Sequence, residues 1–370
     1  MKILYPDYNN CLVNVSNSIL KYYGAENTHS TLLELDKYLE KDYKNVVLIL
    51  YDGFGSDLIK KHLGEDSFLH RNKIKDITSV FPATTTAATT SIITGLTPIE
   101  HCWLGWDIYV EPIDKTVTMY WNVIKNTDIK AADYHVAKQE FSYVTIFDKI
   151  NEANNAKAYC VSPFDGINYP VDKPDEMYSK ILELCKLDEK KFIYAYCNQP
   201  DSLMHEVGTE DNKAIELMKI LNQKTEELSN ELEDTLLIVL ADHGHMTVGE
   251  YIILDDYPTL KDMLIRETSI EPRAVSFFVK EGMLEVFKEE FNKLFSKDFI
   301  LFSKQEVLDK KLFGSGLVHE KFDSCLGDFI AIATTNKTIT DIRDDNPLRG
   351  AHAGITEDEV LVPLIVIAKK

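Results

Sequence analysis

Short apolar runs recur along the chain and alternate with stretches whose apolar residues follow helical spacing. The runs lie at residues 46–51, 192–197, 236–240 and 329–334, with a weaker one at 158–161. The helical stretches lie at residues 26–39 and 213–232, and the second carries many charges on its other face. This alternation predicts an α/β fold in which helices sandwich a mainly parallel sheet.

The stretch from residue 257 to residue 328 has a different pattern. It predicts a strand at 274–279, a helix at 283–294 and a strand at 299–302, and neither strand runs into an acidic residue or a histidine. We therefore expect residues 257–328 to form a small α+β cap, inserted into a core made of residues 1–256 and 329–370. The last apolar run, at residues 361–367, returns to the core sheet.

Side chains that commonly bind metals follow three of the apolar runs, and one more lies in a glycine-bracketed loop before the last run. These residues are Asp52, Asp201, His205, Asp242, His243 and His352. In open parallel sheets, functional residues gather after the carboxyl ends of the strands. Taken singly, each residue has an ordinary explanation, such as a helix cap, a turn or a surface pair. Together, three aspartates and three histidines suit two divalent ions, zinc above all.

A threonine-rich segment at residues 81–95 ends as helices commonly end. Gly95 can adopt the left-handed conformation that closes a helix, and Pro98 bars its continuation. The helix would then begin near Thr84–Thr86, where a hydroxyl lies beside free backbone N–H groups. Such a position binds anions. The alternative is that the threonines only cap the helix.

The order of these elements resembles the type I phosphodiesterase/nucleotide pyrophosphatase family of the alkaline phosphatase superfamily. The shared motifs are Asp-Gly at 52–53, Phe-Pro-x-x-Thr at 81–85, Thr-Gly-Leu-x-Pro at 94–98, Pro-Asp-x-x-x-His at 200–205, Asp-His-Gly at 242–244 and the late His352. They span residues 45–366 and leave only the cap without a motif. The resemblance implies an alkaline phosphatase-like core.

The resemblance also implies a two-zinc hydrolase of phosphoric esters with Thr85 as the nucleophile. Alignment back from Thr94 selects Thr85, and Thr84 and Thr86 are the alternatives if the register slips by one residue. The implied ligand sets are Asp201, His205 and His352 for one zinc, and Asp52, Asp242 and His243, completed by Thr85, for the other. Zinc would lower the pKa of the threonine hydroxyl and neutralise the phosphoryl oxygens, so a covalent phosphothreonine-type intermediate is expected.

The chain departs from the family pattern at two places beside the expected site. The family usually has Phe-Pro-Asn after the nucleophile, whereas this chain has Thr86, Ala87 and Ala88. The missing Asn weakens the prediction of diester and nucleotide specificity, and Thr86 or Thr89 are candidates to replace it. The family's Asp-His-Gly-Met becomes Asp-His-Gly-His-Met, which places His245 near the metals. We interpret His245 as supporting the ligands or facing the substrate, against a purely structural role.

Three aromatic residues follow the expected nucleophile helix at short intervals. They are Trp103, Trp106 and Tyr109. They could stack on a nucleobase or on another apolar leaving group, although aromatic clusters more often serve packing.

The charge of the chain limits its partners. Sixty acidic residues against forty Lys and Arg give a formal net charge of -20, which repels a nucleic-acid polymer. Bound cations would still allow a small phosphate ester to bind. The sequence shows no signal peptide, no membrane-spanning run and six scattered cysteines, so we expect a cytoplasmic protein with reduced thiols. The oligomeric state is not predicted.

Two alternatives to the phosphodiesterase prediction stay open at this point. A phosphomonoesterase or a phosphomutase of the same superfamily would share the two-metal core, and a mutase would need basic residues on its second domain. The cap offers Lys304, Lys310, Lys311 and Lys321. A non-catalytic metal-binding scaffold is disfavoured because every expected ligand and the hydroxyl are present. Sulfatases are excluded, since the Cys/Ser-x-Pro-x-Arg segment is absent.

Overall fold

The apolar runs at residues 46–51, 192–197 and 236–240 form three adjacent parallel strands in the middle of a seven-stranded sheet. The computed structural model describes residues 1–163, 169–171 and 173–370. In spatial order the strands are β2 (Lys73–Thr78), β18 (Leu361–Lys369), β9 (Thr235–Ala241), β1 (Asn45–Tyr51), β8 (Lys191–Cys197), β6 (Lys157–Ser162) and β7 (Tyr169–Pro170). β18 runs antiparallel to both of its neighbours, and the pairs from β9 to β7 are parallel.

The register of the central strands prepares the site. Tyr51 at the end of β1 lies beside Cys197 of β8 on one side and Ala241 of β9 on the other. The three strands therefore end level, and the residues that follow them leave the sheet at one edge. All residues of β1, β8 and β9 are buried, which explains why these strands read as continuous apolar runs rather than alternating ones.

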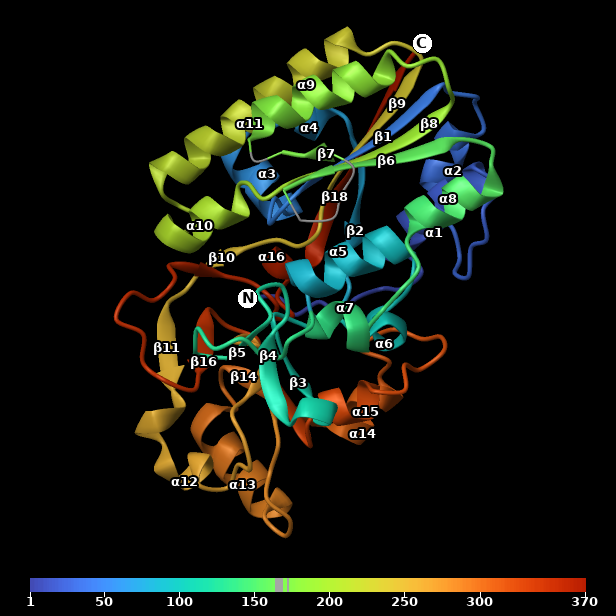
Figure 1. Ribbon diagram of the computed structural model, residues 1–370. Helices are drawn as coiled ribbons and strands as arrows, with labels where there is room; N and C mark the ends of the chain where they lie inside the picture. Colours follow the sequence, from blue (N-terminus) through green and yellow to red (C-terminus); the bar gives the residue numbers. More distant parts are fainter. Residues whose placement is uncertain (164–168, 172) are drawn as a thin grey trace.

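Two groups of helices cover the two faces of this sheet (Figure 1). One group comprises α1 (Leu12–Tyr22), α2 (Leu33–Leu39), α5 (Thr85–Thr94) and α8 (Ile146–Ala153). The other comprises α3 (Ser56–His62), α4 (Phe68–Arg71), α9 (Pro174–Cys185), α10 (Asp201–Val207) and α11 (Asn212–Glu231). In α11, Ala214, Met218, Leu221 and Leu228 are buried at helical spacing, as the sequence predicts for residues 213–232. The predicted sandwich of helices around a mainly parallel sheet is confirmed.

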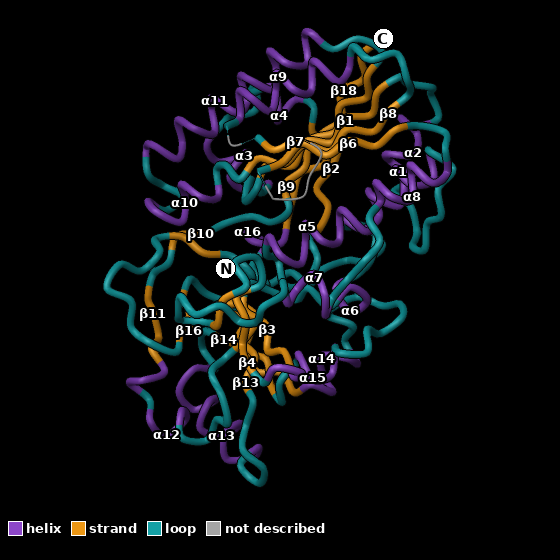
Figure 2. Tube along the Cα trace, in the orientation of Figure 1, coloured by secondary structure: helices purple, strands orange, loops and turns teal. Residues whose placement is uncertain are grey.

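A second seven-stranded sheet forms the other lobe, and Figure 2 shows its strands apart from those of the first. In spatial order its strands are β14 (Phe299–Ser303), β15 (Phe329–Ala333), β13 (Ala274–Phe277), β12 (Ser269–Glu271), β3 (Asp107–Val110), β4 (Lys115–Thr118) and β5 (Val123–Ile124). All of its pairs are antiparallel. Phe287, Phe291 and Phe295 of α13 (Leu284–Phe295) belong to the apolar core on one side of this sheet.

Short elements connect the two lobes. Two small two-stranded sheets lie in sequence between strands of the two large sheets. One pairs β10 (Met246–Thr247) with β17 (Gly350–Ala351), and the other pairs β11 (Glu250–Ile253) with β16 (Lys337–Thr340). The remaining short helices are α6 (Pro98–His101), α7 (Val136–Glu140), α12 (Pro258–Lys261), α14 (Lys304–Asp309), α15 (Phe322–Cys325) and α16 (Glu357–Val360), with single turns of 3-10 helix at Glu111–Ile113 and Leu254–Asp256. None of the helices in the described part of the chain is long and apolar enough to cross a membrane.

Three details differ from the sequence predictions. The run at 329–334, predicted for the parallel core sheet, forms β15 of the second sheet, because a strand buried on both faces has the same pattern in either place. The second sheet also takes in β3, β4 and β5, so its extent does not follow the predicted cap boundaries of 257–328. The helix predicted over 26–39 begins only at Leu33, because the Asn17 side chain accepts hydrogen bonds from the backbone N–H groups of Thr28 and His29.

Candidate active site

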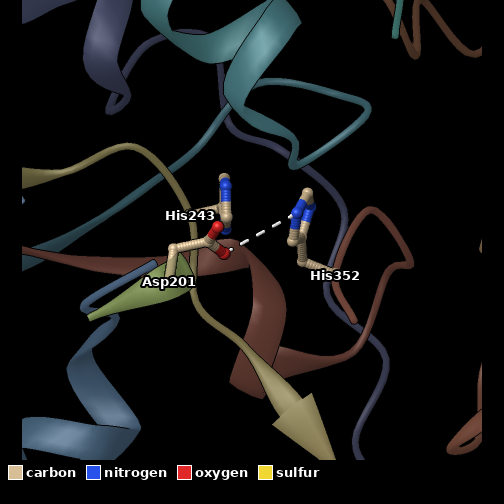
Figure 3. A group of neighbouring side chains, drawn as sticks. All are labelled: Asp201, His243 and His352. Carbon is tan, nitrogen blue, oxygen red and sulfur yellow. Dashed lines mark ion pairs between the residues drawn. The ribbon is translucent and has the colours of Figure 1, made fainter. Parts of the chain in front are cut away.

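The carboxyl edge of the central strands brings the predicted metal ligands together. Asp52 follows β1, Asp242 follows β9, and Asp201 is the first residue of α10 after β8. Backbone hydrogen bonds hold these loops against one another, since the Asp201 N–H donates to the Asp52 carbonyl at 3.1 Å. Figure 3 shows Asp201, His243 and His352 pointing toward one another, with 3.8 Å between Asp201 Oδ1 and His352 Nε2.

One group of possible ligands consists of Asp52, Asp242 and His243. His243 Nε2 lies 3.2 Å from Asp52 Oδ1 and 3.6 Å from Asp242 Oδ2. Thr85 Oγ1 lies 3.2 Å from the same nitrogen and 3.4 Å from each oxygen of Asp52. Donor atoms around a tetrahedral zinc with bonds of about 2.0 Å are about 3.3 Å apart. These four side chains therefore have the spacing of one tetrahedral shell.

A second group forms around Asp201. His205 Nε2 lies 3.3 Å from Asp201 Oδ2, and His245 Nε2 lies 3.1 Å from Asp201 Oδ1. The sets of three that are close enough to share an ion here are Asp201, His205 and His245, and Asp201, His243 and His352. Asp201 is common to both sets, which place His205 with His245 and His352 with His243, so the predicted set of Asp201, His205 and His352 is divided between them.

The histidine rings are oriented from behind, as in metal sites. Nδ1 of His243 lies 2.8 Å from the Gly244 carbonyl, and Nδ1 of His205 lies 2.8 Å from the Gly350 carbonyl. Nδ1 of His352 lies 3.3 Å from the Ala83 carbonyl. A proton on each Nδ1 leaves Nε2 with its lone pair turned toward the carboxylates, which is the tautomer that binds a metal.

Unsatisfied polar atoms in the cluster fit a bound cation. Asp201 Oδ1, Asp242 Oδ2 and both ring nitrogens of His245 are buried and have no hydrogen-bond partner among the described residues. Leaving such groups buried without a partner is costly. Coordination to divalent ions would satisfy the two carboxylate oxygens and one ring nitrogen of His245, so the residues present fit the metal ions that the resemblance implies.

The electrostatics of the cluster also favour cations. Burial and the neighbouring Asp201 raise the pKa of Asp52, while burial and Asp52 raise that of Asp242 well above its ordinary value. Burial lowers the pKa of His243, but the nearby Asp242 and Asp52 outweigh it and raise this pKa to about 10. Burial and the neighbouring His243 hold the pKa of His352 well below its ordinary value, in the neutral form that binds metals. The carboxylates thus repel one another in the absence of positive charge.

Among the three candidate nucleophiles, Thr85 is the one beside the ligands. It is the first residue of α5 and is buried, with 7% of its surface exposed. Thr84 precedes the helix and donates its hydroxyl hydrogen bond to Glu271 Oε1 at 2.6 Å. The Thr86 hydroxyl is buried and has no hydrogen-bond partner within the described residues. This arrangement supports the register that selects Thr85, and α5 ends at Gly95 in the left-handed conformation, as predicted.

The sequence prediction missed two contributors to the cluster. Tyr196 of β8 donates a hydrogen bond to Asp52 Oδ2, and the available signal was a hydroxyl within an otherwise apolar run. Gly244 is the second, because a Cβ there would lie 1.9 Å from the Asp358 carbonyl oxygen. The glycine of Asp-His-Gly is therefore needed for close packing of this loop against the start of α16.

A cavity of about 750 Å³ opens beside the nucleophile helix. Thr89 and Thr90 of α5 line it, together with an aromatic wall and several polar side chains. The aromatic residues are Trp103, Trp106, Tyr120, Trp121, Tyr143, Phe147 and Tyr194. Neighbouring ring centroids lie 5.5 Å apart between Trp106 and Tyr120 and 5.7 Å apart between Trp103 and Tyr143. This volume is ample for a small molecule.

Some of the predicted substrate contacts line this cavity and others do not. Trp103 and Trp106 line the cavity, whereas Tyr109 packs against Phe278 and the guanidinium of Arg266, away from it. Thr89 lines the cavity too, but its hydroxyl donates to the Thr85 carbonyl at 2.6 Å.

Comparison with known proteins places these features in a family. The model of the type I phosphodiesterase/nucleotide pyrophosphatase family matches residues 46–354. Comparison with curated protein sequences gave no significant match.

Solved structures are similar in fold. Human ectonucleotide pyrophosphatase/phosphodiesterase 5 is 18% identical, with a TM-score of 0.66 over 87% of each chain. The inactive murine protein, in which one threonine is replaced by alanine, was solved in complex with AMP. It is 17% identical, with a TM-score of 0.64 over 88% of this chain and 87% of its own. Phosphonoacetate hydrolase from Sinorhizobium meliloti 1021, in complex with phosphonoformate, is 17% identical, with a TM-score of 0.62 over 86% and 89%.

The family match covers most of the chain and includes every residue of the cluster. The similar structures extend over both lobes, which agrees with the alkaline phosphatase-like α/β fold. The chain therefore belongs to the type I phosphodiesterase/nucleotide pyrophosphatase family of phosphoric ester hydrolases.

Proposed function

We propose that this protein is a two-metal hydrolase of small phosphoric diesters or pyrophosphates, with Thr85 as its nucleophile. The observation that carries the proposal is the position of Thr85 Oγ1, which lies 3.2 Å from His243 Nε2 and 3.4 Å from the Asp52 carboxylate. A hydroxyl at this point has a group of possible metal ligands on one side and the start of a helix on the other.

Each residue of the cluster has a part in this chemistry. Asp52, Asp242 and His243 would hold one ion beside Thr85, and Asp201, His205 and His352 would hold the other. Bound zinc supplies positive charge that favours the alkoxide form of the hydroxyl and neutralises phosphoryl oxygens. Thr85 Oγ forms a bond to phosphorus while the bond to the leaving oxygen breaks, and water later hydrolyses the phosphothreonine. The first N–H groups of α5 favour the anionic phosphoryl group at the same place.

The aromatic cavity is suited to the organic part of the substrate. Thr89, one helical turn after Thr85 on α5, lines the cavity. The Tyr120 hydroxyl of the aromatic wall lies 3.3 Å from Thr89 Oγ1. Flat aromatic walls favour a planar ring such as a nucleobase. The AMP bound to the inactive murine relative supports this class of substrate.

Replacing Trp106 with alanine tests the cavity. For p-nitrophenyl thymidine 5′-monophosphate we expect kcat/KM to fall by about 10-fold, which corresponds to loss of one aromatic stacking contact. For methyl p-nitrophenyl phosphate, which has no base, kcat/KM should change by less than about 3-fold, because no stacking contact is lost. Tyr109→Ala is the matched control, since Tyr109 lies outside the cavity. Equal losses on both substrates would contradict the proposal for the cavity.

The position of the cap lysines argues against a phosphomutase. Lys304 pairs with Asp323 on the surface, and Lys321 pairs with Glu140. Lys310 and Lys311 line a separate small hollow beside Tyr5. None of these four lysines lines the aromatic cavity, so they do not support a phosphosugar site beside Thr85.

Metal removal and a pair of substrates test the proposed function together. Treatment with a chelator should abolish hydrolysis, because the phosphoryl charge is then no longer neutralised, and zinc should restore it. The zinc-loaded protein should hydrolyse bis-p-nitrophenyl phosphate faster than p-nitrophenyl phosphate. A preference for the monoester would move the protein to the phosphatase alternative. Inactivity on both, with two zinc ions bound, would favour the non-catalytic scaffold.

A further inference from the structure

His245 is a buried histidine that the family pattern does not account for. Its side chain is fully buried, and neither ring nitrogen has a hydrogen-bond partner in the part of the chain that the structure describes. Its Nε2 lies 3.1 Å from Asp201 Oδ1, which also lacks a hydrogen-bond partner among those residues. The two atoms are close enough to form an ion pair, and their separation is also that of two ligands of a common ion.

The ribbon of β10 and β17 explains how His245 reaches this position. The ribbon pairs Met246 with Ala351 in antiparallel register. His245 precedes the first strand and His352 follows the second, so the two histidines extend from the same end of the ribbon. Their ring centroids are 5.5 Å apart. The residue added after Asp-His-Gly therefore places a second histidine opposite the predicted ligand His352.

Close packing holds the ring of His245 in place. A Cβ at Gly350 would lie 2.4 Å from His245 Cε1 and 2.5 Å from the Met204 carbonyl oxygen. Only a residue without a side chain fits there. The Gly350 carbonyl oxygen also lies 2.8 Å from Nδ1 of His205. Gly350 thus seats both histidines that lie nearest to Asp201.

We propose that His245 is the fourth protein ligand of the ion held by Asp201, His205 and His352. The proposal rests on the two-metal site of the proposed function. Nε2 of His245 and Nε2 of His352 lie 3.1 Å and 3.8 Å from Asp201 Oδ1, and Nε2 of His205 lies 3.3 Å from Asp201 Oδ2. Two donor atoms bound to one tetrahedral zinc are expected about 3.3 Å apart, which is close to these distances. His245 lies closer to Asp201 than His352 does. If His352 is close enough to share an ion with Asp201, His245 is close enough as well.

Zinc affinity of the substrate-free protein tests this proposal. Wild-type protein stripped of metal should bind two zinc ions per chain in competition with a chromogenic chelator. In His245→Ala, one of the two affinities should fall at least about 100-fold, since even residues behind the ligands contribute 10- to 100-fold, while the other stays unchanged. The zinc-dependent rise in Tm should shrink accordingly, with the metal-free Tm unchanged.

Two further variants separate coordination from packing. Met246→Ala removes the neighbouring buried side chain from the same ribbon and should keep both zinc affinities. If His245→Ala lowers the metal-free Tm, His245→Asn replaces it as the test, because it keeps a polar side chain and removes the imidazole. Two wild-type affinities in a stably folded His245 variant would overturn the proposal and leave His245 as a substrate contact. Failure of the wild-type protein to bind zinc would instead overturn the two-metal function itself.

Discussion

Replacing Thr85 with alanine should lower kcat by at least about 1,000-fold, because the group that attacks phosphorus is then missing from an otherwise intact site. This corresponds to about 4 kcal/mol of lost transition-state stabilisation. Both ions should remain bound, because Asp52, Asp242 and His243 still surround one of them. Steady-state rates on bis-p-nitrophenyl phosphate, together with zinc content of the same samples, measure the two effects.

Two matched variants on the same helix make this test specific. Thr94→Ala also removes a buried threonine hydroxyl, one that donates to the Thr90 carbonyl at the far end of α5, and it should leave kcat unchanged. Thr85→Ser keeps a hydroxyl at the same position and should retain measurable turnover. Near-normal rates in Thr85→Ala would show that another group attacks phosphorus, and Thr84 and Thr86 would be the next residues to replace.

The clustering of the candidate ligands could be predicted largely because two of them directly follow apolar strands. Asp52 and Asp242 come one residue after β1 and β9, and both strands are buried along their whole length. When neighbouring parallel strands end at the same level, the residues that follow them lie at the same edge of the sheet. This holds regardless of how the rest of the chain folds. The spacing within Asp201-x-x-x-His205 is likewise local, since one helical turn joins the two side chains.

The features that escaped prediction depend on contacts between distant parts of the chain. The second sheet joins β3 to β12 through the pairing of Asp107 with Ile270, more than a hundred residues apart. Glu271 accepts hydrogen bonds from the Thr84 hydroxyl at 2.6 Å and the Trp106 N–H at 2.8 Å, and so connects this sheet to the nucleophile segment and the cavity. No local pattern of apolar residues encodes such pairings, which is why the extent of the second sheet differed from the predicted insertion.

One such contact also ties the second lobe to the loop that carries His352. Arg273, between β12 and β13, donates to Glu359 of α16 at 2.6 and 2.9 Å, and both side chains are fully buried. Glu359 also accepts from the Gly354 N–H at 2.8 Å, two residues after His352. Burial raises the pKa of Glu359, but Arg273 outweighs it and the net pKa is lowered. The pair therefore stabilises the fold above the ordinary glutamate pKa, and this contribution is lost as the pH falls through the lowered value.

Glu359→Gln or Arg273→Met alone should each lower the free energy of unfolding by about 3–5 kcal/mol, because each leaves its partner buried without a counter-charge. The double variant should lose less than the sum of the two single losses, since no stranded charge remains. Urea unfolding of the metal-free protein at pH 7 measures the three values. Glu216→Gln, which breaks an exposed pair with Lys219, should change stability by less than about 1 kcal/mol. Losses in Glu359→Gln as small as this control would show that the buried pair does not hold the lobes together. If Glu359→Gln also binds zinc as tightly as the wild-type protein, the His352 loop does not depend on the pair of Arg273 and Glu359 for its position.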